Sequence, residues 1–147
     1  MVHALHDVWR TLRSDCLMLD VRCYAQQWPI EVMVDGQWLT VGVVDDSSYA
    51  PDDLAADAAL AQVEREGWFV RERADTFEIY CYWDTLDAMQ REINEVWTPA
   101  HVPDDVMARA QELSNGRCDV PARVRLHMKI SRWRKVKQKV SEKEQKE

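Results

Sequence analysis

Glycine is scarce in this sequence of 147 residues, which has only four: Gly36, Gly42, Gly67 and Gly116. No two of them lie within five residues of each other. Folds that bind a nucleotide-like cofactor at a strand–turn–helix unit need clustered glycines, because a side chain there would block the approach of the backbone to the ligand. The scarcity excludes a cofactor site of that kind, and we predict no catalytic, cofactor-binding or metal-ligating residues in this chain.

Long hydrophobic runs and paired cysteines are also absent. No apolar run approaches the roughly 20 residues that cross a bilayer. The start of the chain, with Asp7 and Asp15, does not follow the residue order of a signal peptide, so we expect a cytoplasmic protein without membrane contact. No C-x-x-C pair occurs, which predicts free, mostly buried thiols and no metal site. The cysteines are Cys16, Cys23, Cys81 and Cys118.

Two other groups of residues could carry chemistry, and a structural role is the simpler interpretation of each. His3 and His6 lie one helical turn apart beside Asp7, a spacing that can hold a metal, but exposed histidines on a first turn explain it as well. Tyr80, Tyr82 and Trp83 place aromatic rings on one strand-like segment. Such a face could line a substrate pocket, and we predict that it packs in the core.

Charge is distributed unevenly along the chain. The formal net charge is −7, yet residues 121–147 contain ten Lys and Arg against three Glu, a local +7, which leaves −14 on residues 1–120. Phosphate would be repelled by most of such a surface. We therefore expect no binding to nucleic acid.

The spacing of apolar residues predicts helices and strands in alternation. Helical spacing marks the segment 2–12, and the continuous apolar run Leu17–Val21 is typical of a buried parallel strand. Asp35-Gly36 between two β-rich runs predicts a hairpin over 30–44. The expected elements that follow are a helix over 51–66 ended by Gly67, strands over 69–73 and 76–83 joined at Ala74-Asp75, a helix capped by Asp84-Thr85, a helix from Pro103 to Asn115-Gly116, and a half-buried antiparallel strand over 122–133.

The order of these segments resembles a known family. His6-Asp7-Val8-Trp9-Arg10-Thr11-Leu12-Arg13, followed by Leu17-Met18-Leu19-Asp20-Val21-Arg22, is similar to the fourth helix and fifth strand of class I S-adenosylmethionine-dependent methyltransferases. The helix with Gly67-Trp68-Phe69, the segment 77–89 and the closing strand 123–134 resemble the rest of that C-terminal half. Ser14-Asp15-Cys16 replaces the Pro-Gly-Gly that the family has at the helix–strand junction.

The resemblance implies a fold and a domain division. The fold would be α/β: a partial Rossmann-like methyltransferase sheet with an antiparallel C-terminal end and an inserted β-hairpin. Residues 1–134 would form a methyltransferase-like C-terminal half-domain, and residues 135–147 a charged, disordered tail. The half that binds S-adenosylmethionine in the family is missing, so a chain of this kind would not catalyse methyl transfer alone.

Two hypotheses for function follow. The chain is a methyltransferase-like fragment without independent catalysis, or it is a small non-enzymatic binding or assembly module. Both share one structural consequence, because the fourth strand that would pair with Leu17–Val21 in the family is absent. An uncovered strand edge pairs readily with another chain, so we expect a homo-oligomer or a partner chain at the Leu17–Val21 edge.

Overall fold

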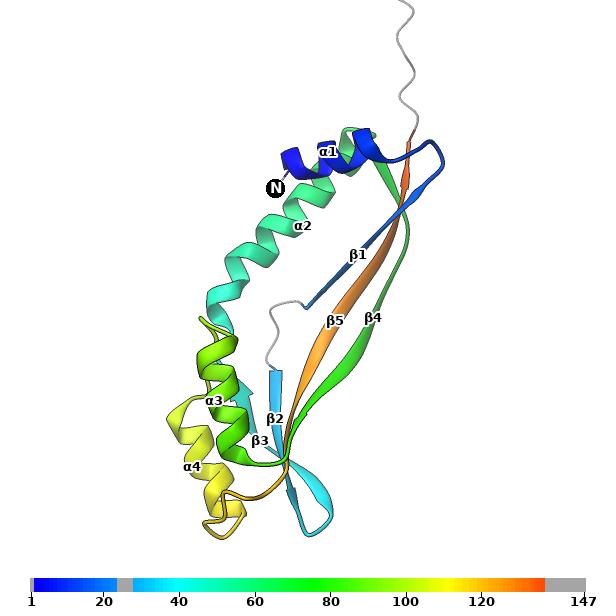
Figure 1. The fold of residues 1–147 in the computed structure, drawn as a ribbon. Helices are drawn as coiled ribbons and strands as arrows, with labels where there is room; N and C mark the ends of the chain where they lie inside the picture. Colours follow the sequence, from blue (N-terminus) through cyan, green and yellow to red (C-terminus); the bar gives the residue numbers. More distant parts are fainter. Residues whose placement is uncertain (1, 24–27, 137–147) are drawn as a thin grey trace, which may run out of the picture. The chain divides into compact units, whose positions relative to one another are not determined.

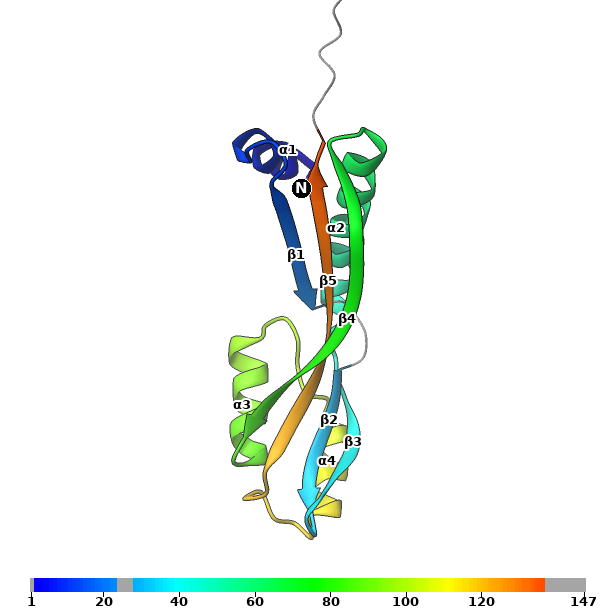
Figure 2. The same cartoon turned by 90° about the vertical axis from the view of Figure 1, so that its right-hand side faces the viewer.

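The computed structural model of the chain describes residues 2–23 and 28–136. Within them the fold is mixed α/β, with four α-helices and a five-stranded, mostly antiparallel sheet (Figures 1 and 2). The elements in chain order are α1 (Val2–Thr11), β1 (Leu17–Cys23), β2 (Trp28–Val34), β3 (Gln37–Val44), the short 3-10 helix Ser47–Tyr49, α2 (Ala50–Arg65), β4 (Phe69–Trp83), α3 (Leu86–Val96), α4 (Asp104–Leu113) and β5 (Ala122–Lys135).

The described chain divides into two compact units. The first unit comprises residues 2–21, 54–75 and 130–136, and the second comprises 22–23, 28–53 and 76–129. Each unit has its own cluster of buried apolar side chains. The strands β4 and β5 each contribute one segment to both units.

In the first unit, α1 and α2 pack on one side of the strands β1, β5 and β4 (Figure 1). The buried side chains at the centre of this unit come from α2, β4 and β5: Leu60, Val63, Phe69 and Trp133. α1 packs against them through the stripe that its helical spacing predicts, Leu5, Val8 and Trp9 included. α2 ends as Gly67 predicts, because this residue adopts φ +74° and the Trp68 amide donates to the Val63 carbonyl at 3.0 Å.

In the second unit, the predicted hairpin is confirmed. β2 pairs antiparallel with β3 around Asp35 and Gly36, whose φ angles of 48° and 78° are the two positive values of a type I′ turn. The other edge of β2 pairs antiparallel with β5, where Ile30 lies opposite Val124. The helices α3 and α4 cover the hairpin and contribute the buried residues Leu86, Met89, Ile93, Val106, Met107 and Ala110.

Three sequence-based predictions are corrected by the structure. Leu17–Val21 is not a parallel strand buried on both faces: it runs opposite to β5 in Figure 2 and its residues alternate between exposed and half-buried. The predicted break at Ala74-Asp75 does not occur, since β4 continues through both residues. Finally, the buried side chains of β5 change from even-numbered to odd-numbered positions along the strand. Val124 and Leu126 are buried in the second unit, whereas Ser131 and Trp133 are buried in the first.

The predicted fold class is confirmed in part. The α/β character holds, and the antiparallel end and the hairpin are present, while the Rossmann-like origin of the sheet stays a proposal. The tail predicted over 135–147 falls outside the described residues, apart from Lys135 and Val136. No helix within 2–23 and 28–136 is both long and apolar enough to cross a membrane.

Candidate functional site at the open face of β1

The strand β1 presents apolar side chains to solvent. Alternate side chains of a strand point to opposite faces, and in β1 the odd-numbered ones point away from the helices. Leu17, Leu19 and Val21 are 42%, 62% and 48% exposed. Met18, on the opposite face, packs against the core of the first unit. Three neighbouring apolar side chains left exposed on one strand face form an unusual feature, since isolated exposed residues are the norm.

β1 is also an edge strand. The order of the sheet is β1-β5-β2-β3, with β4 pairing β5 separately, so β1 ends the sheet among the described residues. The Lys135 amide of β5 donates to the Cys16 carbonyl at 3.2 Å, which directs the backbone of Cys16 towards β5. Because hydrogen-bonding groups alternate along an antiparallel strand, the backbone groups of Leu17, Leu19 and Val21 point towards the free edge.

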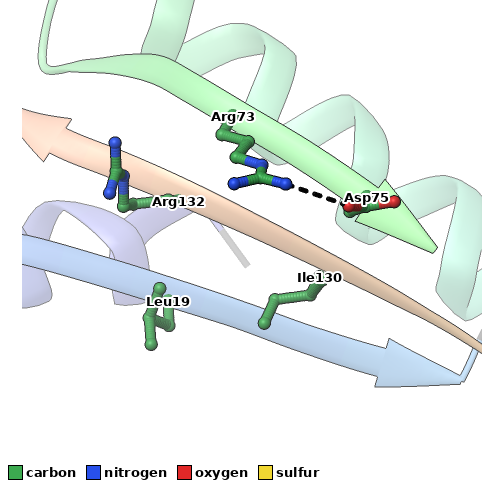
Figure 3. Close-up of a pocket in the computed structure, with 5 residues that line it drawn as sticks. All are labelled: Leu19, Arg73, Asp75, Ile130 and Arg132. Atoms are coloured by element: carbon green, nitrogen blue, oxygen red, sulfur yellow. Dashed lines mark hydrogen bonds and ion pairs between the residues drawn. The ribbon is translucent and has the colours of Figure 1, made fainter. Parts of the chain in front are cut away.

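A shallow hollow of about 230 Å³ lies beside β1 on the same open face. Figure 3 shows its lining: Leu19 of β1, Ile130 and Arg132 of β5, and Arg73 and Asp75 of β4. Leu19 and Ile130 supply the apolar floor. Arg73 pairs with Asp75 at 3.4 Å, and both side chains are largely exposed. Apolar residues surrounded by charged ones are the usual anatomy of a protein interface.

Ion pairs order the basic side of this hollow. Arg132 Nε lies 3.0 Å from Glu72 Oε2, and Arg134 Nε donates to Glu72 Oε1. The hydrogen bond from Arg134 is the main cause that holds the pKa of Glu72 below its usual range, and the positive charges of Arg134 and Arg132 act in the same direction. Glu72 thereby holds both guanidinium groups in place on β5.

Sequence reasoning anticipated the edge and missed the hollow. The Leu17–Val21 edge was predicted from a missing strand, and the structure places this strand at the sheet edge. Arg73 and Asp75 were predicted to lie at a break between two strands, and Ile130 within the half-buried last strand, so no sequence argument brought them together. The signal for Arg73 and Asp75 was their alternation, since opposite charges two residues apart share one face of a strand.

The aromatic face of β4 is a further correction. Tyr80 and Tyr82 do not pack in the core: they are 38% and 60% exposed. Trp83 lies on the opposite face and packs with α3, where its Nε1 donates to Glu92 at 2.9 Å.

In the second unit the guanidinium of Arg123 stacks on Tyr80 and on the half-buried Trp38 of β3, 4.6 Å and 4.3 Å from the two ring centroids. Its Nε lies 2.5 Å from Glu31 Oε2. The carboxylate of Glu31 balances the charge of Arg123, and the two rings hold its guanidinium against the face of the sheet. We therefore assign Arg123 a structural role.

The remaining candidates from the sequence are the cysteines and the histidines near the start of the chain. The four cysteines are free thiols, as predicted, but are half-buried and not buried. His6 stacks on Trp68 at 4.3 Å and lies 3.3 Å from Glu66. Among the described residues, no group of three or more His, Cys, Asp or Glu is arranged to hold a metal ion.

Comparisons with protein-family models, with curated proteins and with solved structures find nothing that matches this chain.

Proposed function

We propose that this chain is a small non-enzymatic assembly module that pairs a second copy of itself along the Leu17–Val21 edge of β1. The observation that carries the proposal is the coincidence, on one edge strand, of outward-pointing backbone groups and exposed apolar side chains. An uncovered strand edge and an exposed apolar face each promote association with another chain. Together they supply both the hydrogen bonds and the apolar contact that strand pairing needs.

A second copy is the occupant that the strand itself favours. Antiparallel pairing about a twofold axis is self-complementary, and an axis through Leu19 sets Leu17 of one copy opposite Val21 of the other. The exposed face would then carry apolar cross-strand pairs only, each contributing about 0.2–1 kcal/mol. Arg132 belongs to β5, the strand next to β1, and Arg73 and Asp75 belong to β4 beyond it, so these charged residues would stand outside the pairing.

The first hypothesis from the sequence, a methyltransferase-like fragment, stays a prediction. The antiparallel pairs of β2 with β3 and with β5 belong to the hairpin and the closing strand that this resemblance also implies, so they do not separate the two hypotheses. The exposed apolar edge of β1 makes the assembly module the working proposal, without requiring any catalytic residue or cofactor.

Light scattering coupled to size exclusion tests the proposal. Wild type at micromolar concentration should elute with twice the chain mass of 17.2 kDa. Leu19→Asp should elute as a monomer, because the axis brings two carboxylates together in an apolar strip. The matched control is Leu54→Asp, which alters another exposed leucine of the first unit, 71% exposed on α2. It should remain dimeric. A wild-type chain that is monomeric at this concentration contradicts the proposal.

A further inference from the structure

A second hollow lies entirely within the second unit and has a different chemistry. Its volume is about 240 Å³, and its wall is almost wholly apolar. The residues that line it are Cys23, Trp28, Tyr49, Trp97 and Leu126. Three of these five side chains are aromatic rings, drawn from β2, from the 3-10 helix and from the end of α3. Cys23 is the last residue of β1, but none of the residues Leu17–Val21 used in the pairing proposed above lines this hollow.

The three rings stand at defined angles. Trp28 and Trp97 are nearly perpendicular, at 85° with centroids 6.0 Å apart, and so form a corner. Tyr49 continues the wall, 6.2 Å from Trp28 at 32°. Its hydroxyl lies 2.9 and 3.0 Å from the carbonyl oxygens of Trp97 and Thr98, which ties this ring to the segment that carries Trp97. The corner is therefore held by hydrogen bonding as well as by packing.

The surroundings of the corner are acidic. Asp45 precedes the 3-10 helix that carries Tyr49, and hydrogen bonds from the hydroxyl and the amide of Ser47 lower the pKa of its carboxyl, which lies 3.7 Å from His101. At the wall itself, burial raises the pKa of the Cys23 thiol, and the negative charge of Asp53 raises it further. Burial disfavours a charge of either sign, whereas the negative charge of Asp53, which disfavours a thiolate, favours a cation at the same place.

We propose that this aromatic corner binds a methylated ammonium group, such as the quaternary nitrogen of a choline-like molecule. The faces of the rings attract positive charge, and an N-methyl surface is apolar enough to leave water at small cost. A bare metal ion or a primary ammonium would lose strong hydration without gaining oxygen ligands, because the wall offers almost none. Carboxylates nearby oppose an anion.

Choline is the probe, and its neutral carbon isostere 3,3-dimethylbutan-1-ol is the matched control. Titrations followed by the indole N–H signals in NMR spectra should show saturable binding of choline that shifts the Trp97 signal. The isostere should bind about tenfold more weakly, the difference that a partly desolvated cation–π contact provides. Sodium chloride at equal ionic strength should shift no Trp97 signal.

Variants locate the binding. Trp97→Leu should weaken choline binding about tenfold, while Trp97→Phe keeps an aromatic face and should retain most of it. Trp38→Leu removes a ring of the same unit outside the hollow and should bind choline as wild type does. Equal affinity for choline and its isostere would overturn the proposal, as would wild-type affinity in a folded Trp97→Leu protein or the absence of saturable choline binding.

Discussion

At the scale of single residues, Gly42 of β3 shows how closely a helix can pack on a strand. A Cβ atom added to Gly42 would lie 2.8 Å from Cγ1 of Val106 and closer still to Cγ2. Val106 belongs to α4 and is buried. The glycine is required here by the approach of a neighbouring side chain and not by an unusual backbone angle, which distinguishes it from Gly36 in the hairpin turn.

We predict that Gly42→Ala lowers the free energy of unfolding by about 1–3 kcal/mol, the usual cost of overpacking. Val106→Ala alone should also destabilise the protein, because it leaves a cavity. The double variant should be less destabilised than the sum of the two, since the new methyl group occupies the space that Val106 vacates. Denaturant unfolding of the four proteins measures this coupling. Additive effects would contradict the packing described here.

At the scale of elements, β4 and β5 are joined in the first unit by ion pairs centred on Glu72. The carboxylate of Glu72 contacts Arg132 and Arg134, and these contacts lower its pKa below the usual value of 4.5. A lowered pKa in the folded state means that the unfolded chain takes up the proton first as pH falls. The stability that Glu72 contributes is therefore present above about pH 4.5 and is lost as the pH falls through its lower folded value.

Glu72→Gln should consequently reduce stability near neutral pH, and the difference from wild type should shrink steadily below about pH 4.5. The effect should be small, because solvent and salt screen exposed ion pairs. Thermal melts between about pH 7 and pH 3 measure it. Glu95→Gln, at an exposed position on α3, provides the baseline for the loss of one negative charge. A difference that stays constant over this range would mean that Glu72 acts through packing alone.

At the scale of the whole molecule, the two separate cores matter most. Phe69 is 1% exposed in the core of the first unit, and Ile93 is fully buried in that of the second. Two clusters that share no buried residue can lose stability separately, even though β4 and β5 contribute to both units. Local opening of this kind is common within small proteins.

We therefore predict that Phe69→Ala, which should cost about 3–5 kcal/mol, reduces hydrogen-exchange protection more in α2 than in α3. Ile93→Ala, at a cost of about 2–5 kcal/mol, should show the reverse order. Native-state hydrogen exchange resolved by residue measures both. An equal loss of protection in α2 and α3 for either variant would show that the chain unfolds as one cooperative body.

The sequence alone determined what depends on neighbouring residues along the chain. The Asp35-Gly36 turn, the Gly67 helix end and the start of α3 at Thr85, whose side chain accepts from the Ala88 amide at 3.1 Å, all follow from local backbone chemistry. Helical and alternating spacing likewise located most helices and the last strand, because each of these elements buries one face.

Only the tertiary structure decided which faces are covered. Leu17–Val21 reads as a buried strand, yet the helices of its unit cover only the Met18 side, and sequence cannot show that the other side has no cover. The burial register of β5 changes because different helices pack on it in the two units. The aromatic corner of Trp28, Tyr49 and Trp97 joins residues far apart in the chain, and no local sequence pattern predicts that they come together.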